Sequence, residues 1–242
     1  MCFLLNAISY IAVIAALYAM KITPRSTIPK RTNMLTELRE GFAYAFDSIP
    51  IRSVLMLLGL VSLMGMPYSA LMPVFAESVL RGGPHTLGFL MGASGLGALS
   101  GAIYLAARQN ALGLEKVIPL AATLFGAGLI AFALSRVLWL SLLLMVLTGF
   151  GMMVQMASSN TVLQTWVDDD KRGRVMSLYT MAFMGTVPFG SLFAGSVASR
   201  IGAPNTLMIG GLACMLGAGF FSRHLASLRK IADKRAADVL GT

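Results

Sequence analysis

The sequence predicts an all-α, polytopic membrane protein, and three observations carry this prediction. Apolar runs of about 20 residues, the length of helix that crosses ~30 Å of hydrocarbon, alternate with short polar loops. The composition is 57% hydrophobic and 12% charged with 25 glycines, which suits a helix bundle in lipid, where glycine is tolerated better than in soluble helices. Finally, Lys and Arg concentrate in alternate loops, as cytoplasmic loops require.

Seven apolar runs are long enough to span a membrane. In chain order they are Cys2–Met20, Ile51–Glu77, Thr86–Ala107, Val117–Ser135, Val137–Gln164, Val175–Ser199 and Ala203–Phe221. The first run follows Met1 directly, without the basic flank and cleavage site of a signal peptide. We therefore expect the chain to be the later portion of a longer protein; the alternative is a complete seven-helix protein.

The basic residues predict the orientation of the helices. Sixteen of the 19 Lys and Arg lie in the loops of one side, and only Arg81, Arg136 and Arg200 lie on the other. Because positive loops stay in the cytoplasm, the C-terminus is predicted to lie inside. Topology and lipid contact account for the net charge of +9, so nucleic acid is not needed as a partner.

Four segments follow from this pattern. Residues 1–20 are a transmembrane helix, residues 21–50 a cytoplasmic loop, residues 51–221 a six-helix bundle and residues 222–242 a basic cytoplasmic tail. Within the loop, apolar residues recur at helical spacing and predict an amphipathic helix on the membrane surface. These residues are Met34, Leu35, Leu38, Phe42, Ala45 and Phe46.

An internal repeat divides the six-helix bundle. Met91–Leu99 aligns without gaps on Met184–Leu192, sharing Met, two glycines and Leu. The two segments lie in the middle helices of two groups of three that run in opposite directions, which indicates inverted three-helix repeats; the alternative is a chance match among Met- and Gly-rich helices. Small residues and prolines predict close helix packing and kinks, at Pro67, Pro73, Gly92, Gly95, Gly97, Gly101, Gly185, Pro188, Gly190 and Gly195.

Several motifs resemble the C-terminal half of a major facilitator superfamily transporter, most closely the bacterial branch of macrolide and enterobactin exporters. They are Leu38–Gly41, Met72–Ala76, Arg172–Tyr179 and Pro188–Gly195. One departure is Gly101–Leu105, which lacks the acid of the superfamily's Gly-x-x-x-Asp-Arg loop.

The resemblance implies half of a twelve-helix transporter: the sixth helix, the central loop and helices seven to twelve. It implies secondary active export of a small molecule, drug-like or siderophore-like, across a bacterial cytoplasmic membrane by alternating access, with coupling to protons through the missing N-terminal half. Partners are then the lipid bilayer, the substrate and a missing N-terminal six-helix half. The alternative is a membrane scaffold or accessory subunit that does not transport and has no water-accessible cavity.

The candidate pathway residues are polar or soft side chains near the middle of two helices. Glu77 is the acid found within an apolar run, and its distance from the start of the helix predicts that it lies at the outer membrane interface. The resemblance therefore implies that a coupling acid lies in the missing half. Gln155 falls near the midplane with Ser159 one turn on; whether they line a wet cavity or bond a neighbouring helix stays open. The candidates are Tyr68, Met152, Gln155, Ser159 and Asn160.

Arg172 and Arg174, in the loop from Asp168 to Arg174, are candidates for a cytoplasmic gate. They are expected to bind acids or helix C-termini when the inner gate closes; the alternative is a solvated loop. The sequence predicts no enzyme, metal site or cofactor, because the two histidines, His85 and His224, lie on opposite sides of the membrane without acid partners.

Overall fold

The computed structural model describes residues 10–11, 13–18, 34–108 and 113–240. The chain divides into two compact units, Met1–Asn33 and Met34–Thr242. The first predicted span, Cys2–Met20, lies largely outside the described residues, and so does the start of the central loop. All that follows concerns the second unit.

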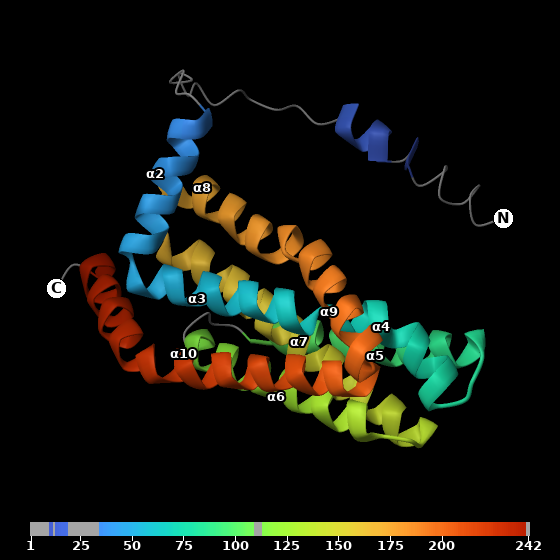
Figure 1. The fold of residues 1–242 in the computed structure, drawn as a ribbon. Coiled ribbons are helices and arrows are strands. Elements are labelled where there is room, and N and C mark those ends of the chain that lie inside the picture. Colours follow the sequence, from blue (N-terminus) through green and yellow to red (C-terminus); the bar gives the residue numbers. More distant parts are fainter. Residues whose placement is uncertain (1–9, 12, 19–33, 109–112, 241–242) are drawn as a thin grey trace. The chain divides into compact units, whose positions relative to one another are not determined.

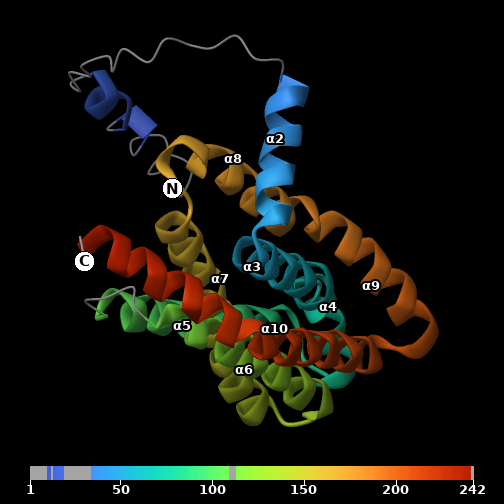
Figure 2. The same cartoon turned by 90° about the vertical axis from the view of Figure 1, so that its left-hand side faces the viewer.

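Six helices of this unit are long and apolar enough to cross a membrane, and Figures 1 and 2 show their arrangement. They are Ile49–Val79, Pro84–Ala106 (α5), Leu114–Leu134 (α6), Leu138–Trp166 (α7), Asp169–Ile201 and the first part of α10, which runs from Ala203 to Leu240. The all-helical bundle predicted from the apolar runs is confirmed, with most ends within three residues of the prediction.

The surface helix predicted before the bundle is α2, Met34–Asp47. Its apolar residues divide into two groups. Ala45 is fully buried, whereas Phe42 and Phe46 are exposed and stack on each other with ring centroids 5.8 Å apart. An exposed aromatic pair on a short helix suits the interface of a bilayer.

Two of the membrane helices are broken near the middle. The first consists of α3 (Ile49–Leu60), the π-helix η1 (Val61–Gly65), α4 (Tyr68–Val74) and a second π-helix, η2 (Phe75–Val79). The breaks fall beside Pro67 and Pro73, as predicted, because proline removes a backbone donor and the helix widens to keep its carbonyls bonded.

The second broken helix is formed by α8 (Asp169–Thr180), the π-helix η3 (Met181–Gly185) and α9 (Val187–Ile201). Pro188 lies in the first turn of α9. Figure 2 shows α8 and α9 on the side of α3 and α4 that faces away from α5 and α6.

The inverted repeat is visible in the packing of its aligned glycines. A Cβ on Gly97 of α5 would lie 2.0 Å from the carbonyl oxygen of Val146 on α7. A Cβ on Gly190 of α9 would lie 2.3 Å from the carbonyl oxygen of Leu63 on η1. The middle helix of each group therefore packs, through the same repeat position, against the first helix of the other group, as inverted repeats require.

The other glycines that were predicted to pack closely differ from one another in their surroundings. Gly101 packs against α7, where a Cβ would lie 3.1 Å from the carbonyl oxygen of Phe150. A Cβ on Gly92, Gly95 or Gly195 would have nothing within 4 Å, and one on Gly185 would meet only the side chain of Met181 in its own helix. The close packing predicted at these four positions is not found among the described residues, because they lie on open faces of α5, η3 and α9.

One helix boundary corrects the prediction. The loop expected from Asp168 to Arg174 is mostly helix, because α8 begins at Asp169. Asp169 and Asp170 occupy its first turn, where acidic side chains stabilise the positive end of the helix dipole. At the other end, α10 continues through the predicted tail to Leu240 without a break.

Candidate functional site

Tyr68, at the start of α4, joins three other helices in the interior of the bundle. Its side chain is 6% exposed, and its hydroxyl lies 3.0 Å from Ser94 Oγ on α5 and 4.0 Å from Met152 Sδ on α7. Its ring meets Phe125 of α6 edge-on, with centroids 6.1 Å apart. The sequence drew attention to Tyr68 and Met152 but not to Ser94, which the repeat segment contains.

Gln155 and Ser159 face the interior of the bundle. They are 1% and 0% exposed, and Gln155 Nε2 donates a hydrogen bond to Ser159 Oγ at 3.4 Å. This bond lies within α7. Next to them Ser158 Oγ is buried without a hydrogen-bond partner among the described residues.

Asn160 begins a polar face at the C-terminal end of α7, which the prediction only partly anticipated. It accepts a hydrogen bond from the exposed Gln164, one turn on. Thr161 and Thr165 are also exposed, and their hydroxyls donate to carbonyls of their own helix at 3.0 and 2.8 Å. Amide groups left against hydrocarbon are costly, so this face belongs against water or protein.

The neighbouring helix α8 extends the polar face. Ser177 and Thr180 are exposed, with each hydroxyl bonded to a carbonyl one turn back at 3.0 Å. Tyr179 joins the two helices, because its hydroxyl donates to the carbonyl oxygen of Met156 at 3.2 Å. The α7 and α8 side chains that form this surface are Asn160, Thr161, Gln164, Thr165, Ser177 and Thr180, and we call it the polar face.

The π-helices of the two broken segments contact each other. Ser62 Oγ of η1 donates a hydrogen bond to the carbonyl oxygen of Phe183 in η3. A carbonyl in a π-helix has lost its usual partner four residues on, and Ser62, fully buried, supplies a replacement. The two breaks thus lie at one crossing point, beside the close approach of Gly190 to Leu63.

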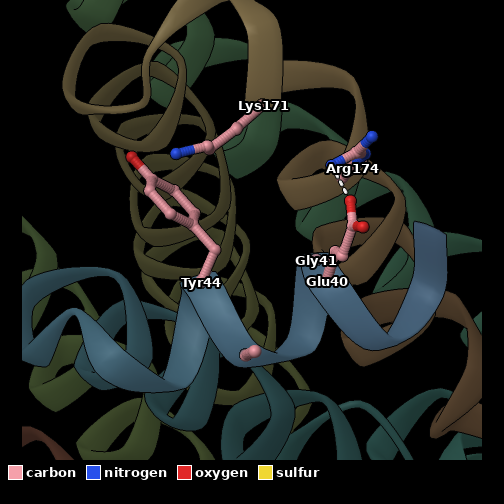
Figure 3. Close-up of a pocket in the computed structure, with 6 residues that line it drawn as sticks. Glu40, Gly41, Tyr44, Lys171 and Arg174 are labelled. Atoms are coloured by element: carbon pink, nitrogen blue, oxygen red, sulfur yellow. Dashed lines mark hydrogen bonds and ion pairs between the residues drawn. The ribbon is translucent and has the colours of Figure 1, made fainter. Parts of the chain in front are cut away.

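A charged cluster links α2 to the start of α8 (Figure 3). Arg174 Nη1 donates to Glu40 Oε2 at 2.7 Å, and Tyr44 donates its hydroxyl proton to Asp168 Oδ2 at 3.1 Å. Lys171 Nζ lies 4.5 Å from the centroid of the Tyr44 ring, within the range of a cation–π interaction. The cluster surrounds a pocket of about 310 Å³.

The two arginines predicted for the gate therefore have different partners. Arg174 reaches an acid on α2, whereas Arg172 pairs with Asp169 of its own helix and donates to the carbonyl oxygens of Gln164 and Val167, at 3.0 and 3.5 Å. Arg172 thus caps the C-terminal end of α7, where unpaired carbonyls attract a cation. The sequence did not identify Glu40 and Tyr44 as partners of this segment. They lie more than 120 residues along the chain from the residues that they contact, Arg174 and Asp168.

Ionisable groups do not gather inside the bundle. Among the described residues, no group of three or more His, Cys, Asp or Glu is placed to hold a metal ion. Glu77 lies in η2 and is exposed. The interior therefore offers neutral hydrogen-bonding groups, thioethers and aromatic rings.

Three comparisons with known proteins agree with this architecture. A family model described as transmembrane secretion effector matches residues 1–239. The staphyloferrin A transporter of Staphylococcus aureus is 26% identical over 213 residues, which cover 87% of this chain and 52% of that protein.

A crystal structure of the Escherichia coli fucose:proton symporter shares the fold with a TM-score of 0.68 and 14% identity, covering 90% of this chain and 53% of that one. The chain thus spans about half the length of the curated relative and of the solved structure that it matches. With the six-helix bundle, the inverted repeat and a family model over nearly its full length, the chain belongs to the transmembrane secretion effector family of major facilitator superfamily transporters.

Proposed function

We propose that this chain forms the C-terminal half of a secondary exporter, which moves a drug-like or siderophore-like small molecule out of the cell by alternating access. The polar face of α7 and α8 is the observation that carries the proposal. The amide groups of Asn160 and Gln164 on this face are expensive against lipid, and transporters place such groups where they line a water-filled cavity. A second six-helix half, facing this surface, completes the pathway.

The polar face gives the pathway a direction within the half. It opens at the end of α7 beside the charged cluster and leads toward Met152 and Tyr68, which lie deeper in the bundle. Thioethers and aromatic rings at the inner end suit an apolar or aromatic substrate, because methionine adapts to irregular shapes. Coupling to protons is assigned to the other half, since the interior described here holds no acid.

Cysteine accessibility tests the pathway face directly. In a variant of the complete protein whose native cysteines are replaced by serine, single cysteines at Gln164 and Ser177 should react with a water-soluble maleimide applied from the cytoplasmic side, and substrate should slow the reaction. Leu143 and Leu147, exposed and apolar on α7, are the matched controls and should be unreactive. Equal reactivity at all four positions, or no protection by substrate, would contradict the proposal.

Reconstitution separates a transporter half from a scaffold. Alternating access needs two bodies that rock against each other, so vesicles that contain these 242 residues alone should not export substrate. Adding the N-terminal six helices of the same protein should restore export. A scaffold would leave export unchanged when this chain is deleted from cells, and that result would overturn the transporter assignment.

A further inference from the structure

We propose that a groove between α3 and α10 is a binding site for an anionic phospholipid of the cytoplasmic leaflet. Figure 1 shows α3 and the first part of α10 running side by side, and the two helices pack against each other. Between them lies a groove of about 280 Å³. The proposal depends on membrane location and not on transport, so its failure would leave the proposed function standing.

The walls of the groove suit an acyl chain. Leu57 and Phe221 form its buried floor, and the rims are the more exposed side chains of Met56, Leu60 and Phe220. Gly217 lets the two helices approach closely here, because a Cβ on it would lie 2.3 Å from Cδ2 of Leu60. Apart from Arg52 and Ser53 at one end, the groove is lined by apolar residues. The Ser53 hydroxyl donates to the carbonyl oxygen of Ile49 in its own helix at 2.7 Å, so a lipid tail would not leave it unpaired.

One end of the groove carries a positive charge. Arg52 lies in the first turn of α3, and among the described residues that line the groove it is the charged one. Its guanidinium donates one hydrogen bond to the carbonyl oxygen of Phe46, at 3.3 Å. Arginine has five donors, so most of them remain for a phosphate group, which the planar guanidinium binds well.

The charge lies at the right depth for a lipid headgroup. Arg52 is near the start of the first membrane helix, and Phe220 and Phe221 are near the end of the last, where Arg223 is also exposed. The loop charges predict that this end faces the cytoplasm, and the cytoplasmic leaflet carries the anionic lipids that attract such residues. A lipid bound in the groove would thus place its headgroup at Arg52 and its acyl chain along the apolar wall, which lies deeper in the membrane.

The exposed rim of the groove indicates that this strip of α3 faces lipid. Met56 and Phe220 are apolar, and their side chains are 56% and 65% exposed. A helix strip of that composition belongs against hydrocarbon. Arg52 adds a positive charge to this apolar surface. Because of this charge, the groove should prefer a lipid with an anionic headgroup over a neutral one.

Native mass spectrometry of the full chain in detergent tests the proposal, with dioleoylphosphatidylglycerol as the anionic probe and dioleoylphosphatidylcholine as the neutral one. The chain should retain one phosphatidylglycerol with about fivefold to tenfold preference, the size expected for one basic residue at the headgroup. Arg52→Gln should abolish the preference. Lys116→Gln removes an exposed cytoplasmic charge outside the groove and should keep it.

A second variant examines the apolar part. Met56→Trp enlarges an exposed rim residue and should reduce retention of both lipids without unfolding the bundle. An unchanged preference in Arg52→Gln, or unchanged retention in Met56→Trp, would show non-specific lipid contact and overturn the proposal. A lipid-free dimer that Met56→Trp abolishes would assign the groove to a second copy of the chain and would also overturn it.

Discussion

At the scale of single residues, α7 separates polar groups that stabilise the bundle from polar groups that face outward. Gln155 and Asn160 lie five positions apart on one helix, yet the first is 1% exposed and donates to Ser159 of the same helix, while the second begins the polar face. Depth in the membrane is thus a weaker guide to function than the direction in which a side chain points.

A pair of leucine substitutions tests this distinction. In the complete protein, Gln155→Leu should change the stability of the bundle by only ~0.6 kcal/mol, a typical value for one hydrogen bond between polar groups in a membrane protein, and should keep transport per folded molecule. Asn160→Leu should lower transport more than stability. Thermal unfolding in detergent and efflux, measured on the same preparations, give both values. Lost transport with normal unfolding in Gln155→Leu would place that residue in the pathway after all.

The ion pair between Glu40 and Arg174 supports a second residue-level prediction. Reversing either charge alone should separate α2 from α8, and reversing both should restore the contact. The side chains are 52% and 33% exposed, so solvent screens the pair and its contribution is about 0.2–1 kcal/mol. The readout is the maleimide reactivity of a cysteine at Ala43, which lines the same pocket: it should rise in each single variant and fall in the double. Equal reactivity in all variants would leave the gate without support.

At the scale of elements, the repeat uses equivalent glycines to set helix–helix distances. Gly97 and Gly190 allow backbone contact, whereas Gly92 and Gly195 lie on open faces of the same helices. The broken helices meet through η1 and η3, so the places where the backbone departs from α-helix are also held by a defined contact, Ser62 to Phe183. Paired breaks at a crossing point give the two repeats a place at which to bend.

Alanine at these glycines distinguishes contact from helix propensity. Gly97→Ala and Gly190→Ala should destabilise the bundle by about 1–3 kcal/mol, the usual cost of overpacking, because the new methyl group meets a rigid carbonyl. Gly92→Ala and Gly195→Ala are matched controls and should be neutral or stabilising by up to ~1 kcal/mol, the difference in helix propensity. Thermal unfolding of the four variants measures this. The same loss in all four would mean that backbone entropy, and not packing, governs these positions.

At the scale of the whole molecule, the charge pattern of the loops predicts one orientation in the membrane. In cells that express the protein with its native cysteines replaced, a cysteine at Gly83 should react with a membrane-impermeant reagent, and a cysteine at Lys171 should react only after the membrane is permeabilised. The reason is that the first turns of α8 around Lys171 carry two further arginines, Arg172 and Arg174, which hold this end of the helix inside. Labelling of Lys171→Cys in intact cells would reverse the assignment and place the polar face at the outer side.

The sequence by itself determined the membrane helices and the repeat. Hydrocarbon thickness imposes a minimum length on every apolar run and leaves no partner for an open backbone, so five of the six helices could be placed within about three residues. The exception is the helix at Asp169–Ile201, whose charged first turns hid its start. Prolines marked the breaks for an equally local reason, the lost backbone donor.

Only the tertiary structure decided which face of each helix is covered. Helical spacing puts Gln155 and Ser159 on one stripe and Asn160 and Gln164 on another, but it does not say which stripe a neighbouring helix buries. It could not pair Arg174 with Glu40, 134 positions away, nor separate the packed Gly97 from the open Gly92. Such choices depend on contacts between distant segments, and these exist only once the helices have assembled in the plane of the membrane.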